Sequence, residues 1–154
     1  LIHALHNISK ILNTEIYIKR DDLISMGGGG NKCRKLEYIV QDAIDKGADT
    51  LITCGSTQSN HCRLTASVAS VEKLKCWLVI EESEEGPYNP DNTGNNYLFN
   101  LLKTNLHITN HTNNIENEME KLYNTVSTIG GFYQASKNYG FNLNKKLYAD
   151  NLNA

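Results

Sequence analysis

The chain has 154 residues, a formal net charge of −2 and a pI near 6.2. This length is enough for about one domain with a buried core. The charge balance argues against a nucleic-acid-binding or membrane-surface protein, because no basic stripe dominates the sequence.

The sequence shows no membrane-spanning or secretory segment. No apolar run approaches the roughly 20 residues that cross a bilayer. The first residues, LIHALHNISK, lack the basic lead and apolar core of a signal peptide, and they begin with Leu, so we expect a fragment of a longer protein. The four cysteines form no C-x-x-C pair and no zinc-like spacing, which predicts a reduced cytoplasmic protein without a metal site. They are Cys33, Cys54, Cys62 and Cys76.

The amino-terminal half predicts alternating strands and helices. EIYIKRDD (15–22) has the alternation of a strand that runs into a polar turn. After a glycine run, apolar residues recur at helical spacing from Leu36 to Ile44, and Gly47 supplies a stop. TLITCG (50–55) is typical of a buried parallel strand, and a second helix is expected over about 60–72.

The pattern continues through the second half. CWLVIEE (76–82) predicts a strand, and after a loop rich in Gly, Pro and Asn a helix is expected near 95–103. LHIT (106–109) predicts a short strand, and a last amphipathic helix follows. Its apolar positions are Ile115, Met119, Leu122 and Val126. Alternating strands and helices with short connections predict the α/β class, with a parallel sheet and flanking helices.

The carboxyl-terminal segment differs in composition. Asparagine occurs four times in residues 1–88 and sixteen times in residues 89–154. The segment has no clear period, so we expect residues past about 130 to be irregular. We therefore divide the chain into an α/β part over 1–130 and a tail of unclear origin over 131–154.

MGGGGNKCRKLEY (26–38) places three cations at the start of a helix, where the macrodipole is also positive. These surroundings disfavour the ammonium form of Lys32 and favour the free amine, which is the form that attacks a carbonyl carbon. Bare glycine backbone allows a planar ligand to approach closely, and Arg34 and Lys35 favour an anion. These features suit a lysine that forms a Schiff base with pyridoxal phosphate.

Two other interpretations of the glycine run remain. The glycines can form a solvated loop whose neighbouring cations face water. A P-loop is disfavoured, because no Ser or Thr follows the lysine to bind magnesium and the G-x-x-x-x-G-K-[ST] order is missing.

A second polar segment, STQSNH (56–61), follows the strand predicted over 50–55. In a parallel sheet, ligands gather at the carboxyl ends of strands, next to helix N-termini that favour a carboxylate. Ser59 or Asn60 can be a simple N-cap, but one cap is enough for a helix and this segment holds five polar residues before His61.

Several of these segments together resemble one family. IKRDD (18–22), GGNKCRKLEY (29–38), DAIDKGADTLIT (42–53) and QSNHCR (58–63) are similar to the D-cysteine desulfhydrase and aminocyclopropane-carboxylate deaminase group of pyridoxal-phosphate enzymes. The resemblance is dense over about 12–82 and weaker to about 103. It implies the tryptophan-synthase β-like fold, of which this chain would hold mainly the small domain.

The resemblance also implies roles for individual residues. Lys32 matches the Schiff-base lysine, and Asn60 matches the residue that hydrogen-bonds the hydroxyl oxygen of the cofactor ring. Ser59 matches a group that holds the substrate carboxylate, and Lys35 a lysine near the cofactor phosphate. The candidate catalytic residues are therefore Lys32 and Ser59, with Lys32, Lys35 and Asn60 binding the cofactor and Ser59, Asn60 and His61 the substrate.

The implied activity is elimination of sulfide from D-cysteine or a related amino acid, leaving pyruvate and ammonia. His61 favours this branch, because the deaminase branch usually has QSNQ where this chain has QSNH. Members of the family are longer and carry a phosphate-binding glycine loop in a later half. We therefore expect the isolated chain to be incomplete and weakly active or inactive, with the strand at 15–22 unpaired, and the full-length enzyme to be a homodimer.

Two alternatives stay open. One is an aminocyclopropane-carboxylate deaminase, and the other is a truncated α/β module without catalytic activity. In each case the partners are small molecules, and neither nucleic acid nor membrane is expected.

Overall fold

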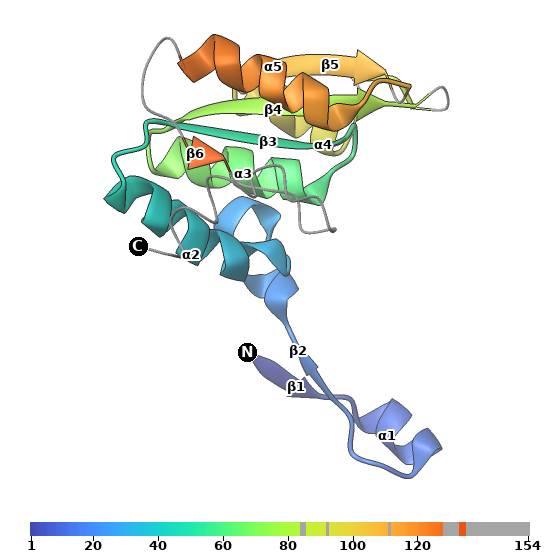
Figure 1. The fold of residues 1–154 in the computed structure, drawn as a ribbon. Coiled ribbons are helices and arrows are strands. Elements are labelled where there is room, and N and C mark those ends of the chain that lie inside the picture. Colours follow the sequence, from blue (N-terminus) through green and yellow to red (C-terminus); the bar gives the residue numbers. More distant parts are fainter. Residues whose placement is uncertain (84–85, 92, 111, 128–132, 135–154) are drawn as a thin grey trace.

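The body of the protein is an α/β sandwich built on a parallel sheet (Figure 1). The computed structural model describes residues 1–83, 86–91, 93–110, 112–127 and 133–134. Its main sheet has the strand order β5-β4-β3-β6, and every pairing in it is parallel. The strands are β3 (Thr50–Ser56), β4 (Lys75–Glu82), β5 (Asn105–Asn110) and β6 (Tyr133–Gln134). The predicted α/β class is confirmed.

Helices cover both faces of this sheet (Figure 1). Along β4, Leu78 and Ile80 face one apolar cluster, whereas Val79 faces the other, as the two-residue period of a strand requires. The first cluster includes α2 (Lys32–Asp45), α3 (Asn60–Val71) and α4 (Asn95–Leu101). The second lies under α5 (Ile115–Ser127). All four helices were expected near these positions from the sequence.

An arm at the amino terminus projects from this body (Figure 1). It consists of β1 (Ile2–Ala4), α1 (His6–Leu12) and β2 (Tyr17–Lys19). The expectation that the strand within 15–22 lacks a partner was wrong, because β2 pairs with β1 in an antiparallel ladder. The sequence analysis missed β1 and α1.

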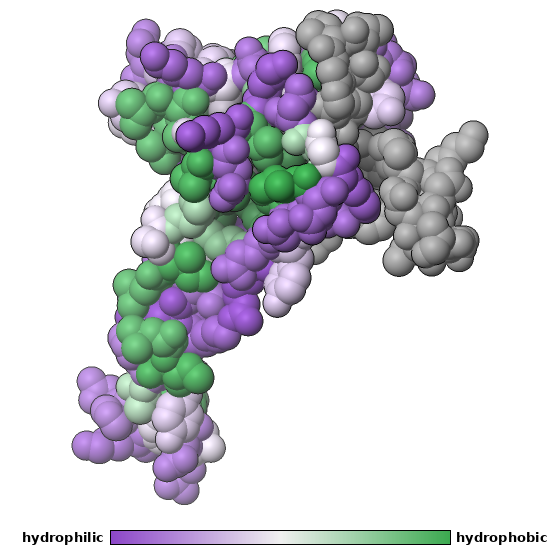
Figure 2. Space-filling model, turned by 90° about the vertical axis from the view of Figure 1, so that its left-hand side faces the viewer, coloured by the Kyte–Doolittle hydropathy of each residue, from purple (hydrophilic) through white to green (hydrophobic). Residues whose placement is uncertain are grey.

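Apolar side chains lie on the surface of this arm (Figure 2). None of the residues of β1, α1 or β2 is buried. The most exposed large apolar residues in this region are Leu1, Ile2, Ile11, Leu12 and Tyr17. The arm is therefore stabilised chiefly by its own ladder and turn, without a core beneath it.

Two short 3-10 turns connect the arm to α2: η1 (Asp21–Leu23) and η2 (Met26–Gly28). The irregular tail expected past about 130 falls outside the described residues, apart from β6, and that expectation stays a prediction. Within the described part of the chain, no helix is both long and apolar enough to cross a bilayer.

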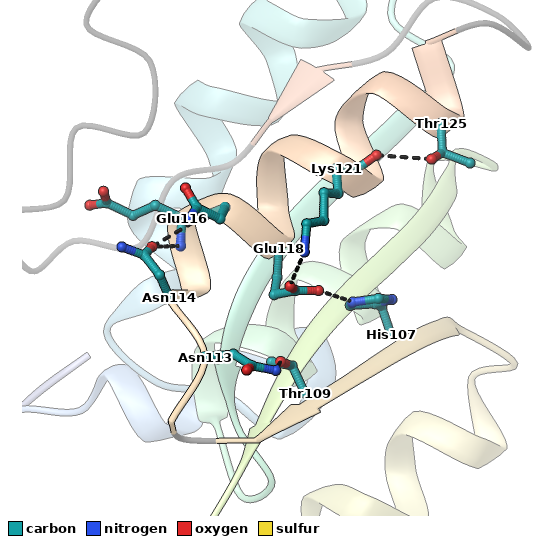
Figure 3. Close-up of polar contacts among 9 residues, drawn as sticks. His107, Thr109, Asn113, Asn114, Glu116, Glu118, Lys121 and Thr125 are labelled. Carbon is teal, nitrogen blue, oxygen red and sulfur yellow. Dashed lines mark hydrogen bonds and ion pairs between the residues drawn. The ribbon is translucent and has the colours of Figure 1, made fainter.

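Polar contacts fix α5 against the sheet edge (Figure 3). The side-chain oxygen of Asn114 accepts hydrogen bonds from the backbone N–H groups of Glu116 and Asn117, which caps the helix. One turn later the Glu118 carboxylate accepts hydrogen bonds from Lys121 Nζ at 2.7 Å and His107 Nε2 at 2.8 Å. His107 belongs to β5, so this carboxylate ties helix to strand.

The Glu118 contacts predict a pH-dependent contribution to stability. Hydrogen bonds from Lys121 and then His107 lower the pKa of Glu118. The stabilisation is therefore full above the ordinary glutamate pKa of about 4.3 and is lost as the pH falls through the lowered value. We expect Glu118→Gln to reduce the free energy of unfolding at neutral pH, with the gap to wild type closing in acid.

Urea unfolding between about pH 6 and about pH 3 measures this gap. Glu120→Gln is the matched control, because Glu120 lies on the same helix with its side chain exposed. A gap for Glu118→Gln that persists unchanged into acid contradicts the assignment.

Candidate functional site

The four glycines before α2 form a tightly held loop. Gly27, Gly28, Gly29 and Gly30 have φ angles of 54°, 82°, 74° and 125°, values that L-residues rarely adopt. The N–H of Gly29 donates to the Met26 carbonyl and that of Gly30 to the Asp21 carbonyl, each at 2.8 Å. A Cβ on Gly29 would overlap the Asp22 carbonyl oxygen. The interpretation as a freely solvated loop is therefore wrong for its second half, where Gly29 is buried.

Lys32 is the first residue of α2 and directly follows this loop. Its side chain and that of Lys35 are half-buried, whereas Arg34 is exposed and lies 3.8 Å from the Asp21 carboxylate. Burial, and then the positive charge of Lys32, lower the pKa of Lys35. The two lysines thus lie close enough to interact at the start of one helix, where an anion between them would be favoured.

Ser59 is the N-cap of α3, directly before its first residue, Asn60. Its Oγ accepts a hydrogen bond from the backbone N–H of Cys62 at 3.2 Å. A Cβ on Gly55, at the end of β3, would lie 2.5 Å from that Oγ, so the glycine allows the turn to fold back over the strand. Ser59 has the capping role considered from the sequence, and because a hydroxyl both accepts and donates, its O–H can still donate to a ligand.

Asn60 lies next to Ser59 and is exposed, with its side-chain oxygen held by two donors. Arg63 Nη1 donates to Asn60 Oδ1 at 2.9 Å, and Asn95 Nδ2 donates to the same oxygen at 3.0 Å. Arg63 Nη2 also donates to the Gly29 carbonyl at 3.0 Å. One guanidinium group therefore links the glycine loop to the first residue of α3.

Asn95 brings the start of α4 into the same network. Its Oδ1 accepts a hydrogen bond from Arg63 Nη1 at 3.2 Å. Gln58 receives the Asn95 backbone N–H on its Oε1 at 2.8 Å and donates from Nε2 to the Thr93 carbonyl at 3.2 Å. The N-termini of α2, α3 and α4 are thus held together through hydrogen bonds around Arg63.

Sequence analysis missed Arg63 and Asn95. Arg63 stands in the quoted QSNHCR segment, three residues after Asn60, and residues three apart on a helix are neighbours. That spacing was a usable signal for Arg63. Asn95 lies 35 residues from Asn60, and no local sequence pattern predicts a contact between residues so far apart in the chain.

His61 lies on a different side of α3 from Asn60. It is 6% exposed, and its Nε2 lies 2.9 Å from Thr53 Oγ1 in β3. The ring is therefore packed between helix and sheet. The predicted substrate contact of His61 remains a prediction, and its burial means that a direct contact would need the ring to move.

The four cysteines are buried thiols. Burial raises the pKa of Cys76 to about 12, with Cys62 adding to the effect, and burial also raises that of Cys33. Thiols in this state are poor nucleophiles. In the part of the chain that the structure describes, no group of three or more His, Cys, Asp or Glu side chains is arranged to hold a metal ion.

The donor set of this region suits a ligand with an aldehyde, a hydroxyl oxygen and a phosphate. Lys32 supplies a primary amine, Asn60 an exposed amide, and Lys35 a cation. The glycine backbone at Gly28 is exposed, and an added Cβ there would meet no atom within 4 Å. These residues fit pyridoxal phosphate in the chemistry of their functional groups.

The family model for pyridoxal-phosphate dependent enzymes matches residues 2–139. This chain belongs to that family. The family is named for pyridoxal phosphate. The sequence analysis predicted the same cofactor from the residues around Lys32.

Curated relatives carry more specific names. The chain is 39% identical over 130 residues to a protein of Klebsiella pneumoniae named D-cysteine desulfhydrase. The matched region covers 84% of this chain and 40% of that protein. It is 49% identical over 100 residues to a D-cysteine desulfhydrase of Salmonella paratyphi B, covering 64% of this chain and 28% of that protein. The chain thus spans well under half the length of these relatives.

Solved structures agree in fold. A crystal structure described as an ACC deaminase homologue superposes with a TM-score of 0.77 at 34% identity, over 88% of this chain and 41% of that one. An O-ureido-L-serine synthase superposes with a TM-score of 0.63 over 87% of this chain and 40% of that one. At 18% identity, the second comparison shows the fold alone.

The loop geometry predicts different costs for two glycine substitutions. Gly28 and Gly29 have similar positive φ angles of 82° and 74°, but only Gly29 faces a backbone carbonyl. We expect Gly28→Ala to cost about 1 kcal/mol of stability through its φ angle, and Gly29→Ala roughly 2 kcal/mol or more. Urea unfolding followed by circular dichroism measures both, and equal costs would contradict the close approach at Gly29.

Proposed function

We propose that this chain is the cofactor-binding part of a pyridoxal-phosphate dependent carbon–sulfur lyase of the D-cysteine desulfhydrase type. The observation that carries the proposal is the position of Lys32. It follows a glycine loop in positive-φ geometry, and Arg63 ties that loop to the first residue of α3. Family membership, and the names of relatives up to 49% identical, support the same choice.

In this proposal each polar group of the site is assigned a role. Lys32 binds the cofactor aldehyde covalently through its amine, and Lys35 contributes positive charge beside the phosphate. The amide nitrogen of Asn60 donates to the ring hydroxyl oxygen, because the oxygen of that amide is already occupied by Arg63 and Asn95.

Ser59 is assigned to the substrate carboxylate. Its O–H can donate while its oxygen accepts from Cys62 N–H. The twelve-residue helix α3 begins beside it, and the positive end of its dipole favours an anion there.

The proposed reaction removes the α-proton of D-cysteine and expels the β-thiol as sulfide, leaving pyruvate and ammonia after hydrolysis. When bound, pyridoxal phosphate supplies an electron sink for the charge that develops at the α-carbon. Lys32 is the proposed base for the proton, because the residue that would hold the cofactor would also place an amine beside the reacting carbon.

An aminocyclopropane-carboxylate deaminase is the second candidate. The observation that favours it is the superposition on the ACC deaminase homologue with a TM-score of 0.77. We propose the desulfhydrase first because the curated relatives at 39% and 49% identity carry that name. In either case the proposed setting is a cytoplasmic homodimer acting on a small amino acid, without nucleic-acid or membrane partners.

Cofactor capture at Lys32 is the first test. We expect pyridoxal phosphate to give a visible absorbance band with the purified chain, and borohydride reduction to fix the cofactor on Lys32, as located by peptide mass spectrometry. Lys32→Ala should abolish both signals. The matched control is Lys46→Ala at the other end of α2, which should retain them.

The same test in the polypeptide that the full gene encodes separates two failures. Where that polypeptide is longer than the 154-residue chain, a band in the longer one and none in the shorter assigns the missing affinity to residues outside the chain. Attachment at a lysine other than Lys32, or none in either polypeptide, contradicts the proposal, and a Lys32→Ala variant without effect on any ligand favours a module without catalytic activity.

Product analysis distinguishes the two enzyme candidates. The polypeptide encoded by the full gene should release sulfide and pyruvate from D-cysteine, and little 2-oxobutyrate from the cyclopropane amino acid. The reverse ranking of kcat/KM would overturn the desulfhydrase assignment and establish the deaminase. Lys32→Ala should remove either activity, because the covalent link and the base are lost together.

A further inference from the structure

We infer that Arg63 is a positioning residue, which fixes the side-chain amide of Asn60 with its nitrogen toward the cofactor. This inference rests on the proposed function, because it assigns a cause to the orientation of a proposed cofactor-binding group. It concerns a residue that the sequence analysis left without a role.

The orientation follows from what a guanidinium group can do. Arginine carries only donors, so the Asn60 atom that lies 2.9 Å from Arg63 Nη1 must be the oxygen. The same argument fixes Asn95, whose atom at 3.2 Å from Arg63 Nη1 must also be its oxygen. Asn95 therefore turns its nitrogen toward Asn60 Oδ1, at 3.0 Å, and adds a second donor to that oxygen.

Backbone groups fix the other end of the network. Asn95 Nδ2 also donates to the Gln58 carbonyl at 2.6 Å, and a carbonyl can only accept. The Asn95 N–H, which can only donate, faces Gln58 Oε1 at 2.8 Å. The amide orientations of Gln58 and Asn95 are thus determined at both the oxygen and the nitrogen, and that of Asn60 at its oxygen. Flipping one of them would place two donors or two acceptors against each other.

Two further features indicate that Arg63 is held for this task. Its Nη2 donates to the Gly29 carbonyl at 3.0 Å, so the group that orients Asn60 also contacts the loop three residues before Lys32. Its Nε is buried without a hydrogen-bond partner among the described residues. A buried donor without a partner costs stability. We take that cost as a sign that the contacts of the two terminal nitrogens, Nη1 and Nη2, set the position of the side chain.

A double-mutant cycle tests the inference. Pyridoxal phosphate is titrated into the polypeptide encoded by the full gene and into its Arg63→Lys, Asn60→Ala and double variants, and the dissociation constant is read from the visible band. We expect Arg63→Lys to weaken binding about tenfold, because lysine cannot hold Gly29, Asn60 and Asn95 at once. In the Asn60→Ala background the same change should weaken binding by less than about threefold.

The wavelength of the band is the second readout. Arg63→Lys and Asn60→Ala should shift it in the same direction, since both remove the hydrogen bond to the ring oxygen, and a merely structural role would not. Arg20→Lys is the matched control, because it makes the same chemical change in the turn that follows the arm, where Arg20 contacts Asp22. It should leave both readouts unchanged.

Circular dichroism without cofactor establishes that each variant is folded. If Arg63→Lys does not fold, Asn95→Ala replaces it in the cycle and should show the same loss of effect in the Asn60→Ala background. Equal effects of Arg63→Lys in both backgrounds, or none, overturn the role of Arg63 while leaving the proposed function intact. No visible band in the unmutated polypeptide encoded by the full gene contradicts the proposed function itself, and this role with it.

Discussion

Three chain segments that are distant in sequence meet at the guanidinium group of Arg63. It donates to the carbonyl oxygen of Gly29, which lies three residues before the start of α2. It also donates to the Oδ1 atoms of Asn60 and Asn95, the first residues of α3 and α4. The guanidinium group is planar and carries five N–H donors in a fixed geometry, so one side chain can serve several acceptors at once. A permanent cation with several donors is well suited to hold three helix starts in one geometry, because each start offers oxygen atoms to it.

The parallel sheet determines the position at which the N-termini of these helices come together. Residues 50–55 of β3 are all buried, so the strand is fixed in depth by burial of apolar surface. Its last residue, Ser56, is exposed, and the polar turn that follows stands at the carboxyl edge of the parallel sheet. The position of Asn60 is therefore set by the core below it, and its orientation by Arg63 beside it.

The positive charge at the start of α2 has a partly different explanation from the one expected. Arg34 has a carboxylate, Asp21, at 3.8 Å, so one of the three cations is compensated by the protein. Lys35 is the residue whose pKa is lowered, with burial as the larger cause and Lys32 as the second. A phosphate bound beside Lys35 would favour its charged form, because an opposite charge acts against both causes.

The regular elements of the body could be predicted from the sequence because their residues carry a period. Leu51 and Ile52 lie in opposite apolar clusters, and Leu36, Val40 and Ala43 form one buried stripe of α2. The missed elements carry no such signal. The strand β1 is only three residues long, and no residue of α1 is buried. The Arg63 junction was missed because it exists only after three separate segments have packed together.

For His61 the sequence motif and the structure point to different roles. It favoured the desulfhydrase branch because the other branch usually has glutamine, yet in the folded chain its ring contacts Thr53 beneath α3. Successive helix residues point about 100° apart, and here the Asn60 residue is exposed whereas His61 is buried. Any effect of this position on substrate choice is therefore expected to act through the turn above it. The His61 ring contacts β3, and the next two residues toward the amino terminus, Asn60 and Ser59, form the turn that carries the proposed ligand groups.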